Sequence, residues 1–577
     1  MKFKRSLSTL MALGLTASFL AGCNVGGNTV KYDPNRTQLF VGVVDGGIGD
    51  EWCYAFKARF EEAYKEVSYE EGKTGVEVII DKSKSVGGNS IGTSLDTLPY
   101  EVYFTEVVYY RDLVANNALA DITDIVTGNL SAYGESESIE NKLTENYADY
   151  LSVNEKYYAL PYYEDTYACY YDKDMFKKYS FYLAANTEDD TYPAAYELVD
   201  GEKYFEFTDG SVELSAGADG VKATEDDGLP ATVEQFLALC STMAENGVKP
   251  ITFSGSSSYY ITRWLKALSV SLMGEERARM QYNFNGVNDS IVESVNADGT
   301  VTLMEPQTIT NENGYLTYYD AGRYYALKLW EELVNNDYLY SKTKGTYSHL
   351  QAQQDFILGS YKSVPNSVQK IGMLIDGSWW ENESKTFFGS MVNQGYGKDA
   401  ARDKRNFGVM PMPKLNDAQI GDDAMLVNTN LPLAFISSDV EGKQLELAKA
   451  FLQFCYTDES LREFTRIVNM PISVEYELTT DDKNQMTTYG KSLVQLTAEK
   501  TKIYPYSSNS VYTNNTSAFS VDAGWDTIVK GTKYPSVKNY FYNDTISSSL
   551  RTAKTYFDGF KVNYSAEQWR NAYSANF

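Results

Sequence analysis

Residues 157–175 constrain the fold of this chain more than any other segment. They contain seven tyrosines, the adjacent carboxylates Glu164 and Asp165, and one proline, Pro161. Proline fixes its own φ near about −65° and favours extended backbone at the residue before it, so the segment predicts a strand that leads into an exposed, aromatic-rich turn. Tyrosine joins an apolar ring to a polar hydroxyl, which suits either packing at a domain boundary or the binding of a polar, ring-shaped ligand.

Length and charge exclude several classes of protein. A chain of 577 residues is too long for one hydrophobic core, so we expect two or more lobes. The formal net charge of −27 argues against nucleic-acid binding, because Lys and Arg bind phosphates, and against a polybasic membrane surface. His349 is the single histidine of the chain. Catalysis by a Ser-His-Asp or Cys-His arrangement is therefore poorly supported, and metal sites built from several histidines are excluded. The 48 tyrosines indicate either a highly hydrated surface or a binding cleft lined with tyrosine rings.

The N-terminal segment predicts the compartment. Three positive charges fall within the first five residues, an apolar run covers residues 7–20, and Leu-Ala-Gly-Cys follows and ends at Cys23. The apolar run is shorter than the ~20 residues of a membrane-spanning helix, so we expect a signal peptide over residues 1–22. Leu-Ala-Gly-Cys resembles the lipobox of bacterial lipoproteins, which implies cleavage before Cys23 and a diacylglycerol on its sulfur. Residues 23–37 are then the lipidated cysteine and a flexible tether, and we expect a lipid anchor on the extracellular face of the cell membrane.

The next part of the chain alternates between strands and helices. Residues 38–44 form an apolar run that ends at Asp45, and a helix follows in which Trp52 begins a series of aromatic and apolar residues spaced three and four apart. A later strand over residues 102–105 ends next to Glu106. Such an alternation predicts a mainly parallel sheet covered by helices, and ligands usually bind at the ends of its strands. Asp45 and Trp52 are therefore candidate ligand contacts.

A second aromatic site follows an apolar strand over residues 371–375. This strand leads into Trp379 and Trp380, with Glu381 beside them. The tryptophan rings, on which a sugar can stack, then lie next to a carboxylate that accepts hydrogen bonds. Recognition of a pyranose ring requires this combination. Consecutive residues of an extended chain point to opposite sides, so we expect one of the two tryptophans in the core. Another tryptophan, Trp264, lies in a predicted helix, where it either lines a cleft or packs in the core.

Several of these segments resemble those of one protein family. Tyr-Ala-Leu-Pro-Tyr-Tyr-Glu-Asp-Thr-Tyr at residues 158–167, the Gly-Ser-Trp turn at residues 377–379 and the strand at residues 407–413 occur in this order along the chain. They resemble segments of the family 1 extracellular solute-binding lipoproteins of carbohydrate ABC transporters. The resemblance implies an α/β fold of the periplasmic-binding-protein type II architecture, with two lobes, hinge crossings between them and an interlobe ligand cleft.

The resemblance covers residues 23 to about 470 and implies a division of the chain. Lobe 1 is expected to contain residues 38–160 and 430–470, and lobe 2 residues 161–429 and 471–577 with an acidic insertion at 179–228, joined by crossings near 160–165 and 428–435. In this family the place of Glu106 faces the cleft, which makes Glu106 an expected acceptor for a sugar hydroxyl. Pattern and resemblance together give these candidate ligand contacts: Asp45, Trp52, Glu106, Tyr162, Tyr163, Glu164, Asp165, Tyr167, Trp264, Trp379, Trp380 and Glu381.

The acidic insertion holds a candidate metal site. Asp219, Asp226 and Asp227 lie around a glycine-rich loop, and carboxylate and carbonyl oxygens are the ligands that calcium prefers. The EF-hand spacing is missing, so a structural calcium ion and a solvated acidic turn are both open. No cofactor is otherwise required. The four cysteines after Cys23 have neither metal-type nor redox-type spacing, and their apolar neighbours favour buried free thiols over disulfides.

These features predict a lipid-anchored extracellular protein that binds a sugar between two lobes and delivers it to the permease subunits of an ABC importer. We expect the ligand to be an oligosaccharide, the protein to be a monomer, and nucleic acid not to be a partner. Two alternatives stay open: a surface glycoside hydrolase that uses paired carboxylates, and a lipoprotein that senses sugar or mediates adhesion. Glu164 and Asp165 form a poor catalytic pair, because neighbours on an extended segment point to opposite sides. The sequence therefore favours binding over catalysis.

Overall fold

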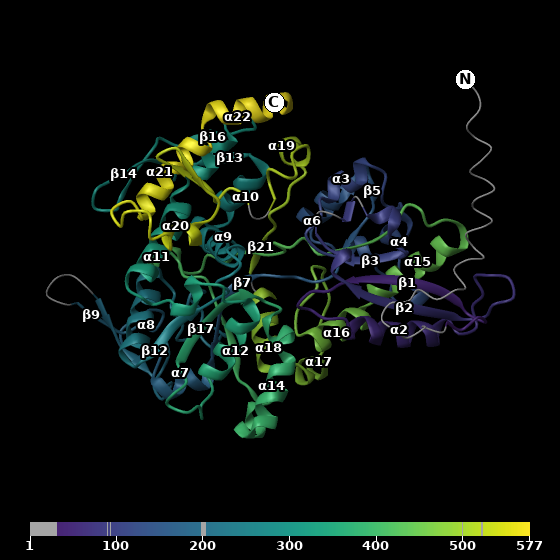
Figure 1. The fold of residues 1–577 in the computed structure, drawn as a ribbon, viewed down its shortest axis with the longest axis horizontal. Helices are drawn as coiled ribbons and strands as arrows, with labels where there is room; N and C mark the ends of the chain where they lie inside the picture. The colour runs from purple at the N-terminus through teal and green to yellow at the C-terminus, as the bar shows by residue number, and fades with distance from the viewer. Residues whose placement is uncertain (1–31, 89–90, 93, 198–202, 499, 521–522) are drawn as a thin grey trace.

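The computed structural model describes residues 32–88, 91–92, 94–197, 203–498, 500–520 and 523–577. The predicted signal peptide and the predicted lipidation of Cys23 lie outside the described residues. Within the described part of the chain, no helix is both long enough and apolar enough to cross a membrane. The chain forms two lobes, each built around a β-sheet with helices packed on it (Figure 1).

Lobe 1 is built on a five-stranded sheet with the strand order β2-β1-β3-β20-β6. Its parallel part consists of β1 (Thr37–Val44), β2 (Val76–Ser83) and β3 (Val102–Thr105). The antiparallel strand β20 (Leu433–Ile436) pairs with β3 on one side and with β6 (Leu160–Pro161) on the other. The apolar run after the tether forms β1, as predicted, and the first three strands of the chain are parallel as expected.

Helix α2 (Glu51–Ala63) connects β1 to β2 and packs its buried side, Trp52, Cys53, Phe56 and Phe60, into the core of lobe 1. The remaining helices and the small hairpin of this lobe are α3 (Tyr110–Ala115), α4 (Thr123–Thr127), α5 (Ile139–Lys142), α6 (Glu145–Leu151), β4 (Ser152–Val153), β5 (Lys156–Tyr157), α15 (Gly442–Cys455) and α16 (Asp458–Val468). Helices α15 and α16 come from the far end of the chain and pack against α2. Lobe 1 is therefore assembled from two separate stretches of sequence.

Lobe 2 is built on a four-stranded mixed sheet with the order β12-β17-β7-β18. Strands β12 (Val248–Thr252) and β17 (Lys370–Gly377) are parallel, whereas β7 (Tyr167–Asp172) runs antiparallel to β17 and to the edge strand β18 (Phe407–Met410). All six residues of β7 are buried, because a central strand is covered on both faces. The tyrosines of the segment 157–175 thus lie largely inside the protein and do not form an exposed turn.

The longer helices of lobe 2 are α8 (Val233–Glu245), α9 (Tyr259–Met273), α10 (Glu275–Asn283), α11 (Ala321–Asn335), α12 (His349–Gly359) and α18 (Thr488–Ala498). Its shorter helices are α7 (Lys173–Tyr179), α13 (Trp380–Glu383), α14 (Lys385–Met391), α19 (Ser510–Thr513) and α20 (Val537–Phe541). Helix α17 (Thr480–Gln485) packs on α16 of lobe 1. Short strands form small hairpins and pairs: β8 (Tyr182–Leu183), β9 (Ala195–Glu197), β10 (Lys203–Phe205), β11 (Phe207–Thr208), β13 (Gly286–Asn288), β14 (Val292–Val295), β15 (Val301–Leu303), β16 (Gln307–Ile309), β19 (Ala424–Leu426), β21 (Thr501–Ile503), β22 (Thr527–Val529) and β23 (Thr532–Tyr534).

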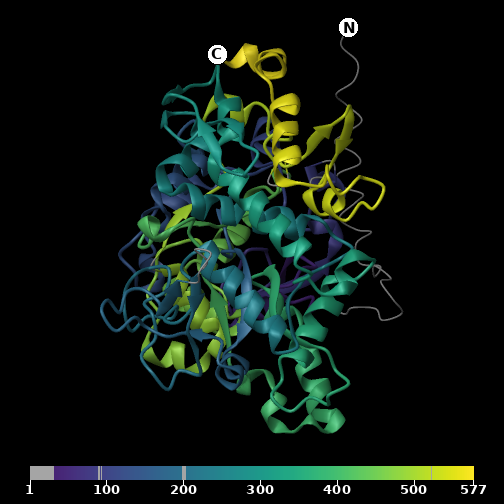
Figure 2. The same ribbon diagram turned by 90° about the vertical axis from the view of Figure 1, so that its left-hand side faces the viewer.

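The C-terminal helices α21 (Ala553–Asn563) and α22 (Ala566–Tyr573) complete one end of lobe 2, drawn in yellow in Figure 2. Helix α21 packs on α11, where the buried Arg323 guanidinium lies 4.7 Å from the centre of the Trp525 ring. A cation over an aromatic face is stabilising when both are removed from water. Trp525 therefore belongs to the core of this end of the lobe.

The first crossing between the lobes runs directly from β6 to β7. The second runs from β19 to β20, near residues 428–435 as the sequence predicts, and is not one continuous strand. The backbone leaves the strand conformation between these elements, with positive φ at Asn428 (56°) and Leu431 (44°). Asparagine tolerates this conformation because its side chain hydrogen-bonds locally, and Pro432 has no amide to donate to a sheet. The two crossings lie side by side, as the main-chain amide of Asn428 donates to the carbonyl of Asp165 at 2.8 Å.

Candidate functional site

The two lobes face each other across the ends of their central strands. Lobe 1 contributes the turns after β1 and β3, and lobe 2 contributes the turn between β17 and α13. The side-chain amide of Asn382 donates hydrogen bonds to the carbonyl oxygens of Gly47 (3.2 Å) and Ile48 (2.7 Å). A Cβ atom on Gly47 would lie 2.0 Å from Cδ1 of Trp379, so only glycine allows this approach. The lobes are thus in contact, and the cleft between them is closed.

Trp379 is the aromatic residue that lobe 2 places at this contact. Its ring packs edge-on against Tyr167, with centroids 5.5 Å apart and an interplanar angle of 87°. Gly377 also shapes the position of the ring, because a Cβ atom there would lie 2.3 Å from Cη2 of Trp379. Separation of the lobes would uncover the part of the indole that now lies against Gly47. Trp379 can therefore offer an aromatic surface to a ligand in the open cleft.

Glu106 follows β3 and lies beside the first crossing. Its carboxylate accepts a hydrogen bond of 2.5 Å from the Tyr163 hydroxyl. Burial raises the pKa of Glu106, while the Tyr163 hydrogen bond and the positive charge of Arg263 act in the opposite direction. A carboxylate held in this way can accept a hydrogen bond from a ligand hydroxyl without first being oriented. The structure thus brings together Glu106 and Tyr163, two of the residues predicted from the sequence to contact the ligand.

Arg263 of α9 adds a positive charge that the sequence reasoning missed. Its guanidinium donates to the Tyr167 hydroxyl at 3.1 Å and to the side-chain oxygen of Asn430 in the second crossing. It also lies 4.9 Å from the centre of the Tyr259 ring. The available signal was helical spacing, because Arg263 comes four residues after Tyr259 and three after Tyr260, which puts all three side chains on neighbouring positions of one helix.

His349 opens α12 and joins the same side of lobe 2. Its Nε2 lies 3.3 Å from a carboxylate oxygen of Glu383, and its ring stacks on Tyr260 with centroids 6.1 Å apart. The hydrogen bond to Glu383 raises the pKa of His349, although burial acts against it. Gln353 links Glu383 (2.6 Å) to Asp376 (3.2 Å), whose pKa is raised well above its usual value by burial. These contacts place His349 in a polar cluster with Glu383, Gln353 and Asp376.

A separate pocket, with about 530 Å³ of empty space that is partly open to solvent, lies along the crossings between the lobes. Its aromatic lining comes from both sides: Tyr109 and Tyr150 belong to lobe 1, and Tyr506 and Tyr512 to lobe 2. Tyr150 and Tyr506 stack on each other in its wall, with centroids 5.1 Å apart. The other lining residues are Val107, Val108, Thr429, Asn430, Leu431, Thr516 and Ser520. Tyrosine rings and hydroxyls at this density provide apolar faces and hydrogen-bonding groups for a polar ring-shaped molecule.

Glu164 and Asp165 tie the crossings together and do not project into the cleft. Asp165 is fully buried and accepts hydrogen bonds from the Thr429 hydroxyl (2.7 Å) and the Asn430 amide (3.2 Å). Burial raises the pKa of Asp165 to about 6, against the opposing effect of these hydrogen bonds. Glu164 is equally enclosed and forms an ion pair of 2.9 Å with Lys502. Asp165 thus joins the two crossings, and Glu164 joins the first crossing to β21. The expectation that both contact the ligand is corrected, because their carboxylates are enclosed by these partners.

Five further residues chosen from sequence lie inside the lobes, and one lies at the surface. Trp264 and Trp380 are completely buried, and Glu381 is buried in an ion pair of 3.0 Å with Arg402. Trp52 and Tyr162 pack on each other and on Phe104 within lobe 1. Asp45 is exposed. We correct the expectation for these five residues, because side chains enclosed in a lobe core do not reach a ligand between the lobes. Of the two adjacent tryptophans, Trp380 is the one in the core.

The candidate calcium loop uses its carboxylates internally. Asp226 accepts hydrogen bonds from the amides of Ala218 (2.8 Å) and Asp219 (3.2 Å), and Asp227 accepts one from the amide of Ala223 (2.8 Å). Among the described residues, no group of three or more His, Cys, Asp or Glu side chains is arranged to hold a metal ion. Calcium binding by Asp219, Asp226 and Asp227 stays a prediction without structural support. The four described cysteines are buried free thiols, as predicted.

Comparisons with known proteins agree with this architecture. A solved structure titled "Chitin oligosaccharide binding protein" resembles the chain with a TM-score of 0.52 at 13% identity, over 92% of this chain and 99% of that one. Maltose-bound MalE3 of T. maritima gives 0.51 at 12% identity, over 93% and 99%. These likenesses confirm the predicted two-lobe α/β fold. No curated protein matches the chain by sequence. The family model "Bacterial extracellular solute-binding protein" matches residues 53–461, and the chain therefore belongs to this family.

Proposed function

We propose that this protein binds a sugar, and specifically an oligosaccharide, in the cleft between its lobes and delivers it to the permease of an ABC importer. The main observation behind the proposal is that aromatic and polar groups of both lobes lie close together at the contact between the lobes. Trp379 lies on the lobe 2 side of this contact, and Glu106 lies on the lobe 1 side. The family assignment and the names of similar structures, one a chitin-oligosaccharide binder and one a maltose-bound protein, support it.

The proposed mechanism is hinge closure. The lobes separate about the crossings, the sugar enters, and the indole of Trp379 stacks on a sugar ring as the lobes return. Glu106 then accepts a hydrogen bond from a hydroxyl, while Arg263 donates one, and the tyrosine-lined cavity takes the remaining rings. Many modest contacts of this kind give an affinity on the order of 1 μM, equivalent to about −8 kcal/mol, which permits both capture and release.

We propose binding without hydrolysis. Glu106 is held by Tyr163, and Glu383 is engaged by both His349 and Gln353. A glycosidase needs one carboxyl group to donate a proton and a second carboxylate free on the other side of the bond. The carboxylates here serve other groups, so no observation favours the hydrolase over the binding protein.

We further propose that the protein acts at the extracellular face of the membrane. The family is extracellular by its description, and lipidation at Cys23 would hold the two lobes near the permease while the tether over residues 23–37 allows movement. We propose that it acts there as a monomer, presenting its closed form to the permease subunits.

The test is to titrate the purified protein with a panel of oligosaccharides and to detect binding by intrinsic tryptophan fluorescence and by calorimetry. We expect saturable binding of one sugar class and recovery of the intact sugar by chromatography. Trp379→Ala should abolish most of the response, whereas Trp379→Phe, which keeps an aromatic ring, should retain part of it. No binding across the panel would overturn the sugar proposal, and shortened products would overturn binding without hydrolysis.

A further inference from the structure

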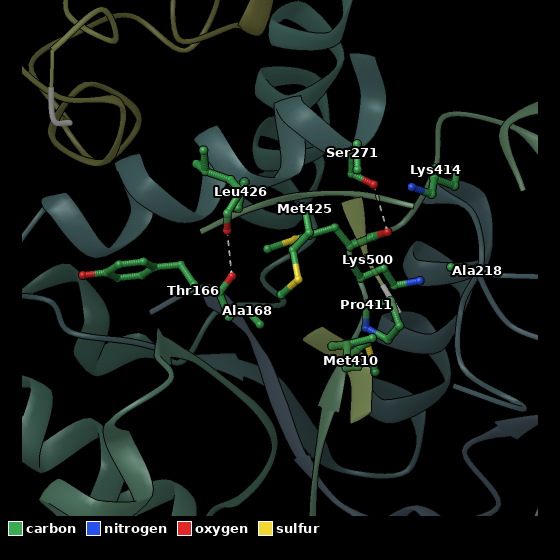
Figure 3. Close-up of a pocket in the computed structure, with 15 residues that line it drawn as sticks. Thr166, Ala168, Ala218, Ser271, Met410, Pro411, Lys414, Met425, Leu426 and Lys500 are labelled. Atoms are coloured by element: carbon green, nitrogen blue, oxygen red, sulfur yellow. Dashed lines mark hydrogen bonds between the residues drawn. The ribbon is translucent and has the colours of Figure 1, made fainter. Parts of the chain in front are cut away.

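Lobe 2 has pockets away from the contact between the lobes. The pocket drawn in Figure 3, between α9 and β19, has a cavity volume of only about 30 Å³ and a wall rich in methionine. Another pocket, with a cavity volume of about 70 Å³, lies between the ends of α7 and α12 and the start of β17. It is at the opposite end of β17 from Trp379. Its lining residues are Met175, Lys178, Tyr179, Gly359, Ser360, Tyr361, Lys362, Val364, Asn366 and Lys370.

Three lysines from different segments meet at this second pocket. The ammonium group of Lys178 donates to the carbonyl of Lys362 at 3.0 Å. The ammonium groups of Lys178 and Lys370 lie 5.3 and 5.2 Å from the centre of the same ring, that of Tyr179. The two charges are therefore no further apart than the sum of these distances. Like charges gathered in this way repel each other, and an anion bound among them would remove the repulsion.

The lining of the pocket supplies positive charge without a carboxylate. Lys362 pairs with Asp399 at 2.8 Å, and Asp399 does not line the pocket. Lys178 and Lys370 form no ion pair within the described part of the chain, although the net charge of the whole chain is −27. Attraction between cations and a helix C-terminus accounts for Lys178, near the end of α7. It does not account for Lys370, which is the first residue of a strand.

A buried hydroxyl adds a further donor. Ser360 follows α12 and is only 2% exposed. Its Oγ accepts a hydrogen bond of 2.9 Å from the guanidinium of Arg405, which also pairs with Asp172 at 2.7 Å. Among the described residues no group accepts the proton of this hydroxyl, so it can donate to a molecule in the pocket. Ammonium and hydroxyl donors together suit the oxygens of a phosphate group.

We propose that this pocket binds a phosphate group, as the free ion or at the end of a larger molecule. The ammonium groups of Lys178, Lys362 and Lys370 donate to its oxygens, together with the hydroxyl of Ser360. One water molecule takes about 10–15 Å³ of cavity volume, so the pocket has room for roughly five non-hydrogen atoms, as many as a phosphate ion contains. The pocket and the contact between the lobes lie at opposite ends of β17, and the proposal does not depend on the sugar site.

Calorimetry of the purified protein with inorganic phosphate, glycerol phosphate and acetate, at one pH and constant ionic strength, tests the proposal. We expect saturable binding of inorganic phosphate with a Kd below about 1 mM. Acetate offers a single charge and fewer oxygens, and should bind at least about tenfold more weakly. Equal binding of glycerol phosphate would assign the site to a phosphate group carried by a larger molecule, and binding of inorganic phosphate alone would assign it to the free ion.

Variants of the lysines separate a binding site from a structural role. Lys370→Met should weaken phosphate binding at least about tenfold, because a charge-assisted hydrogen bond is lost. Lys370→Arg, which keeps the charge, should retain most of the affinity. The matched control Lys443→Met removes an exposed lysine that pairs with Glu446, and should bind phosphate as the unaltered protein does.

The absence of saturable phosphate binding, equally tight binding of acetate, or full phosphate binding by a folded Lys370→Met variant would overturn the proposal. If that variant does not fold by circular dichroism, Lys178→Met decides. Lys178 is exposed, so its replacement leaves the core unchanged, and the affinity for phosphate should again fall at least about tenfold. Full phosphate binding by this variant would contradict the proposal as well.

Discussion

The boundary between the lobes has two regions that are built in different ways. In the crossing region, which comprises residues 160–167 and 426–433, Asp165 is completely buried and its carboxylate is bound by groups of the neighbouring segment. In the mouth, which comprises residues 47–51 together with Trp379, Asn382 and Lys385, the contact at the outer edge lies close to water. The ion pair between Lys385 and Glu51 spans the lobes there, with side chains 32% and 51% exposed.

The difference indicates which contacts persist when the lobes separate. A buried hydrogen bond is expensive to break, because its partner is left without water or a substitute. An exposed ion pair is exchanged for water at almost no cost. The crossing region should therefore stay intact in open and closed forms, whereas the mouth can exchange its contacts for those of a ligand. The following predictions test this distinction, beginning with the largest effect.

The substitution Asp165→Ala should lower the free energy of unfolding by about 2–4 kcal/mol, because it leaves the Thr429 hydroxyl and the Asn430 amide buried without an acceptor. The measurement is urea denaturation at pH 5, below the pKa of about 6 to which burial raises Asp165, so that no buried charge is relieved at the same time. The control is Asp165→Asn, which keeps an acceptor oxygen and should lose less. Equal stability of the Ala variant and the unaltered protein would mean that the crossing region does not hold the hinge.

The pH dependence of stability should carry a contribution from the same residue. An unfolded aspartate has a pKa of about 3.9, and burial raises that of Asp165 to about 6 in the folded protein. Between these values the folded chain keeps a proton that the unfolded chain has lost, so stability falls as pH rises from about 3 to about 7, most steeply between the two pKa values. Each tenfold difference in proton affinity is worth about 1.4 kcal/mol, which gives about 3 kcal/mol.

Denaturation of the unaltered protein and of Asp165→Asn over this pH range isolates the effect. The free energy of unfolding of the unaltered protein, measured relative to that of Asp165→Asn, should fall by about 3 kcal/mol between about pH 3 and pH 7, because only the unaltered protein titrates at this position. Parallel curves would show that Asp165 is not protonated in the folded hinge near pH 5.

At the mouth, Trp379→Ala should weaken sugar binding by about 10- to 100-fold, equivalent to about 1.4–2.8 kcal/mol, since a stacking surface and its burial are lost. The matched comparison is Trp380→Ala. Trp380 is fully buried and packs on Phe407 at 5.0 Å, so its loss should lower the free energy of unfolding by about 3–5 kcal/mol. If both variants lost the same amount of sugar affinity and of stability, Trp379 and Trp380 would not have the different roles that we assign to them at the mouth and in the core.

Sequence patterns predict much of this fold because its strands are local apolar runs. The run that became β1 and the run that became β17 were both found, and Pro161 correctly marked extended backbone at the first crossing. The mistaken exposure of the tyrosine-rich segment has a physical cause: whether a strand lies at the surface or between neighbours depends on pairing with β17 and β18, which are distant in sequence.

The candidate site was less predictable than the fold, because residues in the same local sequence pattern are buried to different depths in the protein. Trp52 and Trp379 both lie between a strand and a helix: Trp52 is in the first turn of α2, and Trp379 directly precedes α13. Only Trp379 lies at the contact between the lobes, where Gly47 and Gly377 leave room for its ring. His349 gave no motif, and Arg263 gave only its helical spacing from Tyr259 and Tyr260. The places of these two residues follow from the packing of α9 and α12 beside β17, which local patterns do not reveal.

The smallest expected effect belongs to the ion pair of the mouth. Lys385→Ala should change sugar affinity by less than about threefold, or under about 0.7 kcal/mol, because both partners are already partly solvated. The effect should vanish in about 1 M salt, where the screening length is about 3 Å. Calorimetry at low and high salt, with the exposed lysine variant Lys443→Ala as a control, provides the measurement. A loss of more than about tenfold that persists in high salt would mean that the mouth holds the lobes as firmly as the crossings do, and the distinction between the two regions would then have to be abandoned.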